Sequence, residues 1–317
     1  MSMGIRTSKV RRLQGGAPTT IDGHTLNYRK GADWYVDASR SGTSSGESFD
    51  NAFLTMAEAF AKVGSGDSIY FTGKVNEQLV TPVNVFDVRV IGMGNRPRHA
   101  DSSPAGGDTH AAQWAAGGLT AATANVRVLQ QGWRFENILF SMVDADAAAI
   151  ELVRNSGSGD AERDASHAAI VGCRFAGAGK GIRSGATSFV EVVNHVLVED
   201  CRFDTNTYGI HGTIVSNYWT IRNNEFRNCT NNITADFGYG FIYDNIFGAF
   251  TDGGTTGGID LSGSSAGLNV ITKNFLSGVF SNAGGYVQSD ANDIWVGNYV
   301  TVEATDAPVG FTIGNPS

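Results

Sequence analysis

Residues 195–210, HVLVEDCRFDTNTYGI, contain a pattern from which the fold can be predicted. They hold the apolar run Val196-Leu197-Val198, then the segment Asp200-Cys201-Arg202-Phe203, then the pair Gly209-Ile210. Each run is too short for a helix and is bounded by polar or small residues, which is typical of a short β-strand. The stretch therefore predicts three short strands in succession, joined by tight corners.

The same pattern recurs from Val126 onward. Its middle segment, ending in a large apolar residue, recurs at Asn137-Ile138-Leu139-Phe140, Gly172-Cys173-Arg174-Phe175, Asn223-Asn224-Glu225-Phe226, Asp244-Asn245-Ile246-Phe247, Lys273-Asn274-Phe275-Leu276 and Gly297-Asn298-Tyr299-Val300. A small or polar residue and then an apolar one follow at 149–150, 181–182, 232–233, 258–259, 285–286 and 310–311. The segments end 21 to 35 positions apart. Three strands per repeat at unequal intervals predict a parallel β-solenoid rather than a propeller, whose blades run ~40 residues or more.

One position of the repeated segment is polar or small in every later repeat. It holds Cys173, Cys201, Asn224, Asn245, Asn274 and Asn298. Because stacked strands lie ~4.8 Å apart, these side chains should lie above one another at a corner. A buried asparagine amide can donate to one neighbour and accept from the next, so the four asparagines predict a hydrogen-bonded ladder. The two cysteines would lie about one coil apart, and the odd total of three cysteines favours reduced thiols.

The composition agrees with a stack of short strands. The chain has 317 residues, with 41 glycines, six prolines and 17% charged residues. We expect the glycine ahead of the second apolar strand, as at Gly181 and Gly209, to permit a bend with positive φ. Proline would remove a backbone donor from a sheet, and none lies between Pro104 and Pro308. No run approaches the ~18 apolar residues of a membrane span, and we expect neither a membrane partner nor a cleaved signal.

The region ahead of the repeats has a different pattern. Residues 34–36 predict a strand, and residues 53–63 predict a short helix, since their apolar residues recur at helical spacing. Thr55 and Glu58 match a capping box at its start. Strands are expected at 69–71, 79–80 and 88–91, and the helix should cover the first strand edge of the solenoid. We divide the chain into an extended basic arm at 1–31, an N-terminal cap at 32–92, a long loop region at 93–125, and coils with a C-terminal cap at 126–317.

The arm is basic, whereas the chain as a whole has a net charge of −8. Its bases are Arg6, Lys9, Arg11 and Arg12, and no acid occurs up to residue 21. A basic arm on an acidic body predicts an arm that binds the acidic face of another subunit. We expect no nucleic-acid partner, because the body would repel a duplex and the arm lacks interleaved aromatic residues.

The repeats resemble the right-handed β-helix of the pectate-lyase superfamily. The opening also resembles this superfamily, through Trp34-Tyr35-Val36-Asp37, Phe49-Asp50-Asn51-Ala52-Phe53 and Gly66-Asp67-Ser68-Ile69-Tyr70-Phe71, which are similar to the start of many bacterial and phage members. The resemblance covers roughly residues 33–311. It implies an all-β, single-stranded, right-handed parallel β-helix with a short N-terminal capping helix and an extended N-terminal arm. The superfamily includes lyases, glycosidases and non-catalytic virion proteins, so the fold alone does not give the function.

The catalytic motifs of pectate lyases and polygalacturonases are missing from the sequence. The Arg-x-Pro-x-x-Arg context of pectate lyases is absent, and Gly209-Ile210-His211-Gly212 only approaches the Gly-His-Gly of polygalacturonases. The weak catalytic candidates are Glu162, Asp164 and His167, in the longest corner insertion. We place His167, His195 and His211 in different coil registers and therefore expect no metal site. No cofactor is expected.

Two functions from different classes remain. The first is a structural virion protein of a tailed phage, a capsid decoration or cement protein attached through its arm. It would be a homotrimer with other virion proteins as partners, located in the virion after assembly in the host cytoplasm. The alternative is a polysaccharide-degrading or polysaccharide-binding β-helix, a tailspike-like lyase or depolymerase with a glycan as its partner.

Overall fold

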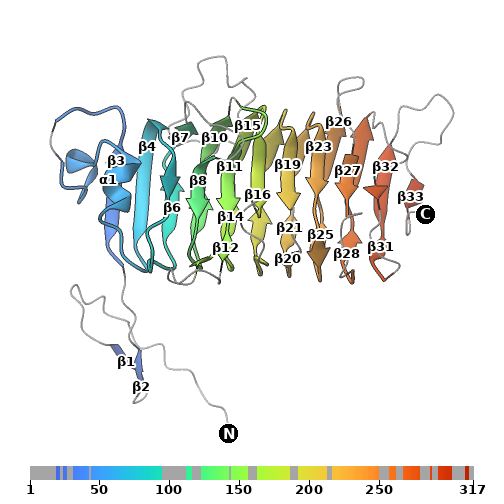
Figure 1. Ribbon diagram of the computed structural model, residues 1–317, viewed down its shortest axis with the longest axis horizontal. Helices are drawn as coiled ribbons and strands as arrows, with labels where there is room; N and C mark the ends of the chain where they lie inside the picture. The colour runs from blue at the N-terminus through green and yellow to red at the C-terminus, as the bar shows by residue number, and fades with distance from the viewer. Residues whose placement is uncertain are drawn as a thin grey trace, which may run out of the picture.

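The computed structural model describes residues 19–21, 24–26, 31–42, 44–94, 112–115, 123–142, 144–155, 163–185, 192–212, 216–249, 257–261, 267–278, 286–287, 292–301 and 311–313. Successive coils stack along one long axis, from the N-terminal to the C-terminal end (Figure 1). Each full coil gives one strand to each of three parallel sheets, which we call sheets 1, 2 and 3. The predicted fold class, an all-β parallel β-helix, is confirmed.

Sheet 1 consists of β3 (Asp33–Asp37), β4 (Ser68–Asn76), β6 (Arg89–Gly92), β9 (Arg134–Glu136), β14 (Ala169–Val171), β17 (Leu197–Glu199), β21 (Thr220–Arg222), β25 (Phe241–Tyr243), β28 (Val270–Thr272) and β31 (Ile294–Val296). Sheet 2 consists of the end of β4 with β7 (Ala112–Ala115), β10 (Leu139–Met142), β15 (Arg174–Gly177), β18 (Arg202–Asp204), β22 (Glu225–Arg227), β26 (Ile246–Ala249), β29 (Phe275–Gly278), β32 (Asn298–Thr301) and β33 (Phe311–Ile313). Sheet 3 consists of β5 (Leu79–Val80), β8 (Ala124–Val128), β11 (Ala148–Leu152), β16 (Lys180–Ser184), β19 (Tyr208–Gly212), β23 (Asn231–Thr234), β27 (Gly257–Asp260) and β30 (Tyr286–Val287). Strand β4 serves both sheets 1 and 2, because it pairs with β6 along its first half and with β7 after Gly73, where φ is +78°.

Equivalent side chains stack inside the coils, as the alignment of the repeats predicted. The last residues of the repeated segment pair in register from one coil to the next. Phe175, Phe203 and Phe226 are fully buried, with ring centroids 4.8 and 4.6 Å apart and nearly parallel planes. A second buried row in sheet 3 consists of Val126, Ile150, Ile182, Ile210, Ile233 and Ile259. The rows form one continuous apolar core.

The corner between sheets 1 and 2 holds the asparagine ladder. Asn224 donates from its backbone N and from Nδ2 to Oδ1 of Asn245, both over 3.0 Å. Asn245 donates in the same way to Asn274, and Asn274 to Asn298, over 2.9–3.1 Å. Each ladder residue is 0–1% exposed. The ladder therefore satisfies amides that would otherwise be buried without partners.

Glycines of sheet 3 have a different role from the one expected. Gly181 and Gly209 do not have positive φ. A Cβ at Gly181 would lie 2.6 Å from the backbone oxygen of Gly209 and 2.7 Å from the ring of Phe203. A Cβ at Gly209 would lie 2.6 Å from the backbone oxygen of Asn232 and 2.7 Å from the ring of Phe226. Glycine is thus required there because the backbone of the next coil and the stacked rings occupy the space of a side chain. Positive φ occurs instead at the ladder corner, just before the ladder residue, as at Asp200, Asn223 and Asp244.

The N-terminal end of the coils is covered by a helix that is shorter than predicted. Helix α1 spans Met56–Phe60, after the 3-10 turn η1 at Phe49–Asn51. The capping box of Thr55 and Glu58 is present and fixes the start of the helix, so Phe53 lies outside it and bridges to Val36 instead. Phe60 packs against the rings of Trp114 and Trp133, at 6.1 and 5.3 Å.

Three further expectations need correction. The region at 93–125 is not only loop, because it contains β7 and the start of β8, and the β7 residue Trp114 is buried. Strand β33 does not continue a coil, because it pairs antiparallel with β32. The arm is not wholly extended, because β1 (Thr19–Ile21) and β2 (His24–Leu26) pair antiparallel.

Short pairs also join β12 (Arg154–Asn155) to β13 (Arg163–Asp164) and β20 (Ser216–Asn217) to β24 (Phe237–Gly238). Among the described residues, no helix is long and apolar enough to cross a membrane.

Candidate functional site

The predicted catalytic candidates are not brought together as a catalytic group. Glu162 lies outside the described residues, as do the arm bases Arg6, Lys9, Arg11 and Arg12. Asp164 ends β13, and its carboxylate accepts from the backbone N of Ser166 and from Gln131 Nε2, each over 2.9 Å. Burial favours the neutral acid, but these hydrogen bonds and the charge of Arg154 outweigh it and lower the pKa of Asp164. Asp164 is therefore an ionised acceptor at neutral pH and a poor general acid.

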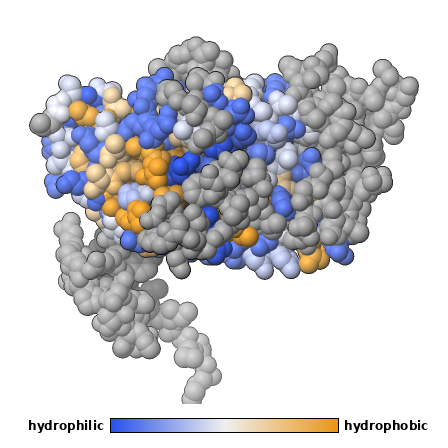
Figure 2. Space-filling view, in the orientation of Figure 1, coloured by the Kyte–Doolittle hydropathy of each residue, from blue (hydrophilic) through white to orange (hydrophobic). Residues whose placement is uncertain are grey.

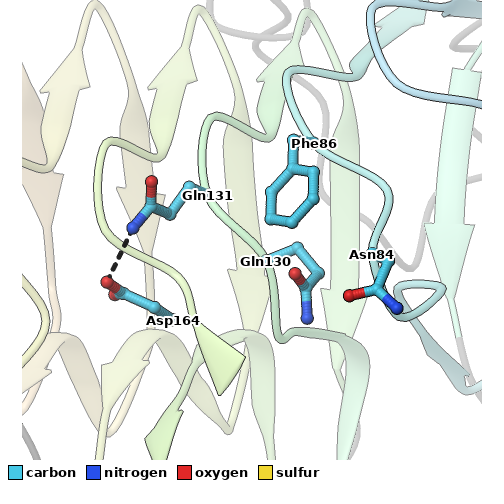
Figure 3. A pocket seen from close by; sticks show the side chains of 5 residues that line it. All are labelled: Asn84, Phe86, Gln130, Gln131 and Asp164. Carbon is cyan, nitrogen blue, oxygen red and sulfur yellow. Dashed lines mark hydrogen bonds between the residues drawn. The ribbon is translucent and has the colours of Figure 1, made fainter. Parts of the chain in front are cut away.

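Asp164 lines a pocket on the outside of the coils. The pocket has a volume of about 290 Å³ and is lined by Asn84, Phe86, Gln130, Gln131 and Asp164. Asn84 and Gln130 lie beneath the Phe86 ring, and the bonded pair of Gln131 and Asp164 lies across from them (Figure 3). The pocket combines an aromatic ring with convergent polar groups, which is typical of a small-ligand site.

The predicted separation of the histidines is wrong for one pair. His167 and His195 share a register, and their rings stack with centroids 4.8 Å apart and planes at 5°. Tyr218 and Tyr239 continue the stack at 4.8 and 5.2 Å. All four residues have positive φ and exposed side chains. A signal for this row existed in the sequence, because each of the four residues lies eight positions before the large apolar residue that ends its repeat, at Phe175, Phe203, Phe226 and Phe247.

The outer side of sheet 3 carries a buried ion cluster. Glu151 on β11 is fully buried and accepts from Arg127 Nε over 2.6 Å and from Arg183 Nη2 over 2.9 Å. These residues stand next to the inward-pointing Val126, Ile150 and Ile182, so alternation directs them outward. Since both Glu151 oxygens are engaged and shielded from solvent, this carboxylate orients the two arginines and is not itself accessible to a substrate.

Lys180, Tyr208 and His211 lie beside this cluster on β16 and β19. Lys180 pairs in register with Tyr208, and its Nζ lies 5.9 Å from the Tyr208 ring centroid. The rings of Tyr208 and His211 are 4.2 Å apart, and His211 pairs in register with Arg183. We call Lys180, Arg183, Tyr208 and His211 the sheet-3 cluster. It places two cations, a phenol and an imidazole on adjacent coils.

The electrostatics of the sheet-3 cluster lower the pKa of its imidazole and of its ammonium group. Burial, together with the charges of Lys180 and Arg183, lowers the pKa of His211 from 6.5 to about 4. Burial and then Arg183 lower the pKa of Lys180, and Asp146 and Asp144 oppose this shift only in part. Lys180 Nζ donates to the backbone oxygen of Asp146 over 3.0 Å. His211 is thus neutral at neutral pH, and Lys180 gives up its proton more readily than an exposed lysine.

Sequence reasoning singled out only His211 among these four residues. A signal for the others existed, because Arg183 and His211 each follow the second-strand apolar residue and Lys180 and Tyr208 each come two positions before it. Two polar features on other faces were also missed. Arg174 and Arg202 both bind the carboxylate of Asp204 on sheet 2, over 2.6 and 3.0 Å. A second ladder joins Gly240, Asn269 and Asp293 at the corner before sheet 1.

The cysteines offer no reactive or metal-binding site. Cys173, Cys201 and Cys229 are free thiols and are fully buried. Burial raises the pKa of Cys229 to about 12. Within the ranges described above, no group of three or more His, Cys, Asp or Glu side chains could hold a metal ion.

Apolar and hydrophilic side chains occupy different parts of the face seen in Figure 2. Apolar side chains gather over the N-terminal coils and hydrophilic ones over the middle coils. The exposed apolar side chains include Val80, Val83 and Phe86 in the segment that reaches the pocket. The C-terminal coils expose Ile294, Val296 and Tyr299.

Several solved structures are similar to this chain. Escherichia coli ybhc is 14% identical, with a TM-score of 0.48, and the match covers 94% of this chain and 88% of that one. The pectin methylesterase of Aspergillus niger is 15% identical, with a TM-score of 0.44 and coverage of 86% and 94%. The alginate lyase of a Paenibacillus species is 10% identical, with a TM-score of 0.41 and coverage of 86% and 91%. No curated protein sequence matches the chain.

A family model matches more than half of the sequence. It covers residues 123–307, which contain all the coils from β8 to β32. The chain therefore belongs to the family described as periplasmic copper-binding protein (NosD).

Proposed function

We propose that this protein is a β-helix that binds an acidic polysaccharide across the sheet-3 cluster. The observation that carries the proposal is the placement of Lys180, Arg183, Tyr208 and His211 on adjacent coils, with ring and charge contacts of 4.2 and 5.9 Å. Lys180 and Arg183 are 9% and 6% exposed, so a sugar carboxylate would contact the exposed edges of these cations, which hydrogen bonds already orient. The half-buried aromatic ring of Tyr208 suits the apolar face of a sugar ring. Successive sugars of an extended chain can then contact successive coils.

The lowered pKa values of Lys180 and His211 favour a second candidate function, cleavage by β-elimination. In this reaction an uncharged base removes the proton next to the sugar carboxylate, a double bond forms, and the glycosidic oxygen leaves with a proton from an acid. His211, which is neutral at neutral pH, would be the base, Tyr208 would be the acid, and Lys180 and Arg183 would offset the charge that develops on the carboxylate. Glu162, Asp164 and His167 take no part in this scheme.

Copper enters through the family description, and the described residues do not fit it. The rings of His167 and His195 are parallel and 4.8 Å apart, so their lone pairs cannot point at one ion. His211 is neutral, but Lys180 and Arg183 beside it repel a cation. The thiols are buried, and Cys173 Sγ and Cys229 Sγ each lie 3.6 Å from a backbone carbonyl oxygen. We therefore derive no step through copper.

The virion hypothesis remains a prediction. It depends on the arm at 1–31, and its four bases lie outside the described residues. The homotrimer and the virion location likewise stay predictions. Polysaccharide binding is the favoured proposal because it is argued from the side chains of the sheet-3 cluster, which lie on adjacent coils.

The test is incubation of the full chain with polygalacturonate and alginate, read by retention on the polymer and by the absorbance of unsaturated ends. We expect retention, weakened by salt because the contacts are ionic. Lys180→Ala and His211→Ala should lose it, and Lys62→Ala, an exposed lysine on the N-terminal cap, should keep it. Retention without the appearance of unsaturated ends would support polysaccharide binding and contradict cleavage. Equal retention of all four proteins would refute the site.

A further inference from the structure

The pocket at Asn84, Phe86, Gln130, Gln131 and Asp164 is built from three successive coils. Asn84 and Phe86 precede β6, the two glutamines lie between β8 and β9, and Asp164 ends β13. The corners are tied together by backbone hydrogen bonds. Asp87 N donates to Gln131 O over 3.1 Å, and Asp164 N donates to Leu129 O over 2.8 Å. The pocket is therefore formed before any ligand arrives.

Side-chain contacts also fix the pocket lining. The backbone N of Phe86 donates to Ser65 Oγ over 2.9 Å, which holds the segment that presents the ring. Gln131 Nε2 donates to Asp164 Oδ2 over 2.9 Å, so the amide and the carboxylate share one orientation. Phe86 stays 38% exposed, and this leaves part of its ring available to a ligand.

The lining indicates the class of ligand. Three amides and one carboxylate can donate to and accept from several hydroxyl groups at once. The partly exposed aromatic ring offers a face for C–H groups. A volume of about 290 Å³ holds one pyranose ring with its hydroxyl groups.

The charge of the pocket decides between neutral and acidic sugars. Asp164 accepts hydrogen bonds on both of its oxygens and is ionised at neutral pH. Arg154 Nε lies 3.9 Å from Asp164 Oδ2, at the edge of a direct ion pair. An ionised carboxylate in the lining disfavours a ligand that carries a second carboxylate.

We propose that this corner pocket is a binding subsite for one neutral pyranose sugar, stacked on Phe86 and hydrogen-bonded by Gln131, Asp164 and Asn84. The subsite is separate from the sheet-3 cluster and does not depend on the function proposed for it. A polysaccharide that contacts both the corner pocket and the sheet-3 cluster would contain neutral as well as acidic sugars.

The test is calorimetric or NMR titration of the full chain with glucose, galactose and mannose, and with glucuronate and galacturonate as acidic probes. At least one neutral hexose should bind, and more tightly than either acidic probe. Phe86→Ala should weaken this binding by about tenfold or more, the effect of losing an aromatic contact of about 1.4 kcal/mol. Phe275→Ala is the matched control, because Phe275 is also 38% exposed but lies on sheet 2 near the other end of the coils.

A second variant guards against a folding defect in Phe86→Ala. Gln131→Leu keeps the size of the side chain but removes the donor to Asp164, and it should also weaken hexose binding. Lys180→Ala should leave hexose binding unchanged. Loss of hexose binding in this variant would show that the sugar binds at the sheet-3 cluster and would overturn the subsite. The absence of hexose binding to the unaltered chain, tighter binding of an acidic probe, or unchanged binding in both pocket variants would overturn it as well.

Discussion

His211 illustrates how its neighbours on sheet 3 change the chemistry of a residue. Its imidazole is held neutral, with a pKa of about 4, by burial and by the charges of Lys180 and Arg183. The unfolded chain binds a proton at this residue below about pH 6.5, and the folded chain binds it only near pH 4. Between these values the unfolded state holds more protons, so stability falls as the pH falls.

We predict that His211→Gln flattens this part of the pH profile. Denaturant unfolding of the two proteins at intervals from pH 7 to about pH 4 is the measurement. The unaltered chain should lose stability more steeply than the variant. Parallel profiles would show that His211 is protonated as readily in the fold as in the unfolded chain.

The three thiols give a second prediction at the scale of single residues. Cys173, Cys201 and Cys229 are fully buried, and burial raises the pKa of Cys229 to about 12. Since the thiolate is the reactive form, none of the three should react with a disulfide reagent in the native protein, and all should react in denaturant. Rapid labelling of the native chain would contradict the packing of the cysteines.

At the scale of elements, the asparagine ladder links coils that are far apart in sequence. Asn245 accepts two hydrogen bonds from Asn224 and donates to Asn274 and to the backbone oxygen of Ile221. Asn298 accepts two from Asn274 and donates to Ile271. We predict that Asn245→Ala destabilises more than Asn298→Ala, at about 1–3 kcal/mol for each polar group left unsatisfied. Equal midpoints in denaturant melts would contradict the ladder.

The phenylalanine row is the apolar counterpart of the ladder. Phe203 is fully buried between the rings of Phe175 and Phe226. Phe203→Ala should lower the free energy of unfolding by about 3–5 kcal/mol, because it opens a cavity that the neighbouring coils cannot close. Phe275→Ala, a partly exposed phenylalanine on the same sheet, is the control and should cost much less. Similar losses in the free energy of unfolding for both variants would show that the phenylalanine row contributes no more to stability than a partly exposed ring.

The elements in which equivalent residues stack could be predicted from the sequence, whereas contacts between variable corners could not. Phe203 and Asn245 recur at fixed places in the repeat, so their rows could be read from the alignment. Lys180, Tyr208 and His211 lie on one surface only because β16 and β19 pair in a particular register. Asp164 and Phe86 share a pocket although nearly eighty positions separate them. The pocket depends on how variable corners fold over one another, and no local pattern records it.

At the scale of the whole molecule, the coils form one continuous core with each coil supported by its neighbours. Helix α1 covers the first coils through Phe60, and β33 pairs with the edge of β32 near the other end. This stack holds two polar surfaces at fixed places, the sheet-3 cluster and the corner pocket. A rigid scaffold with regularly spaced coils is well suited to an extended polymer with regularly spaced sugars.

Binding of an acidic polysaccharide at the sheet-3 cluster is tested most directly by the affinity of the full chain for polygalacturonate, compared with that of Lys180→Met. This change keeps much of the length of the side chain and removes its charge. We predict that the unaltered chain binds and that Lys180→Met binds at least about tenfold more weakly, because a charged hydrogen bond of about 1.5–3 kcal/mol is lost. Equal affinities, or no binding by the unaltered chain to polygalacturonate or alginate, would contradict a polysaccharide site at the sheet-3 cluster.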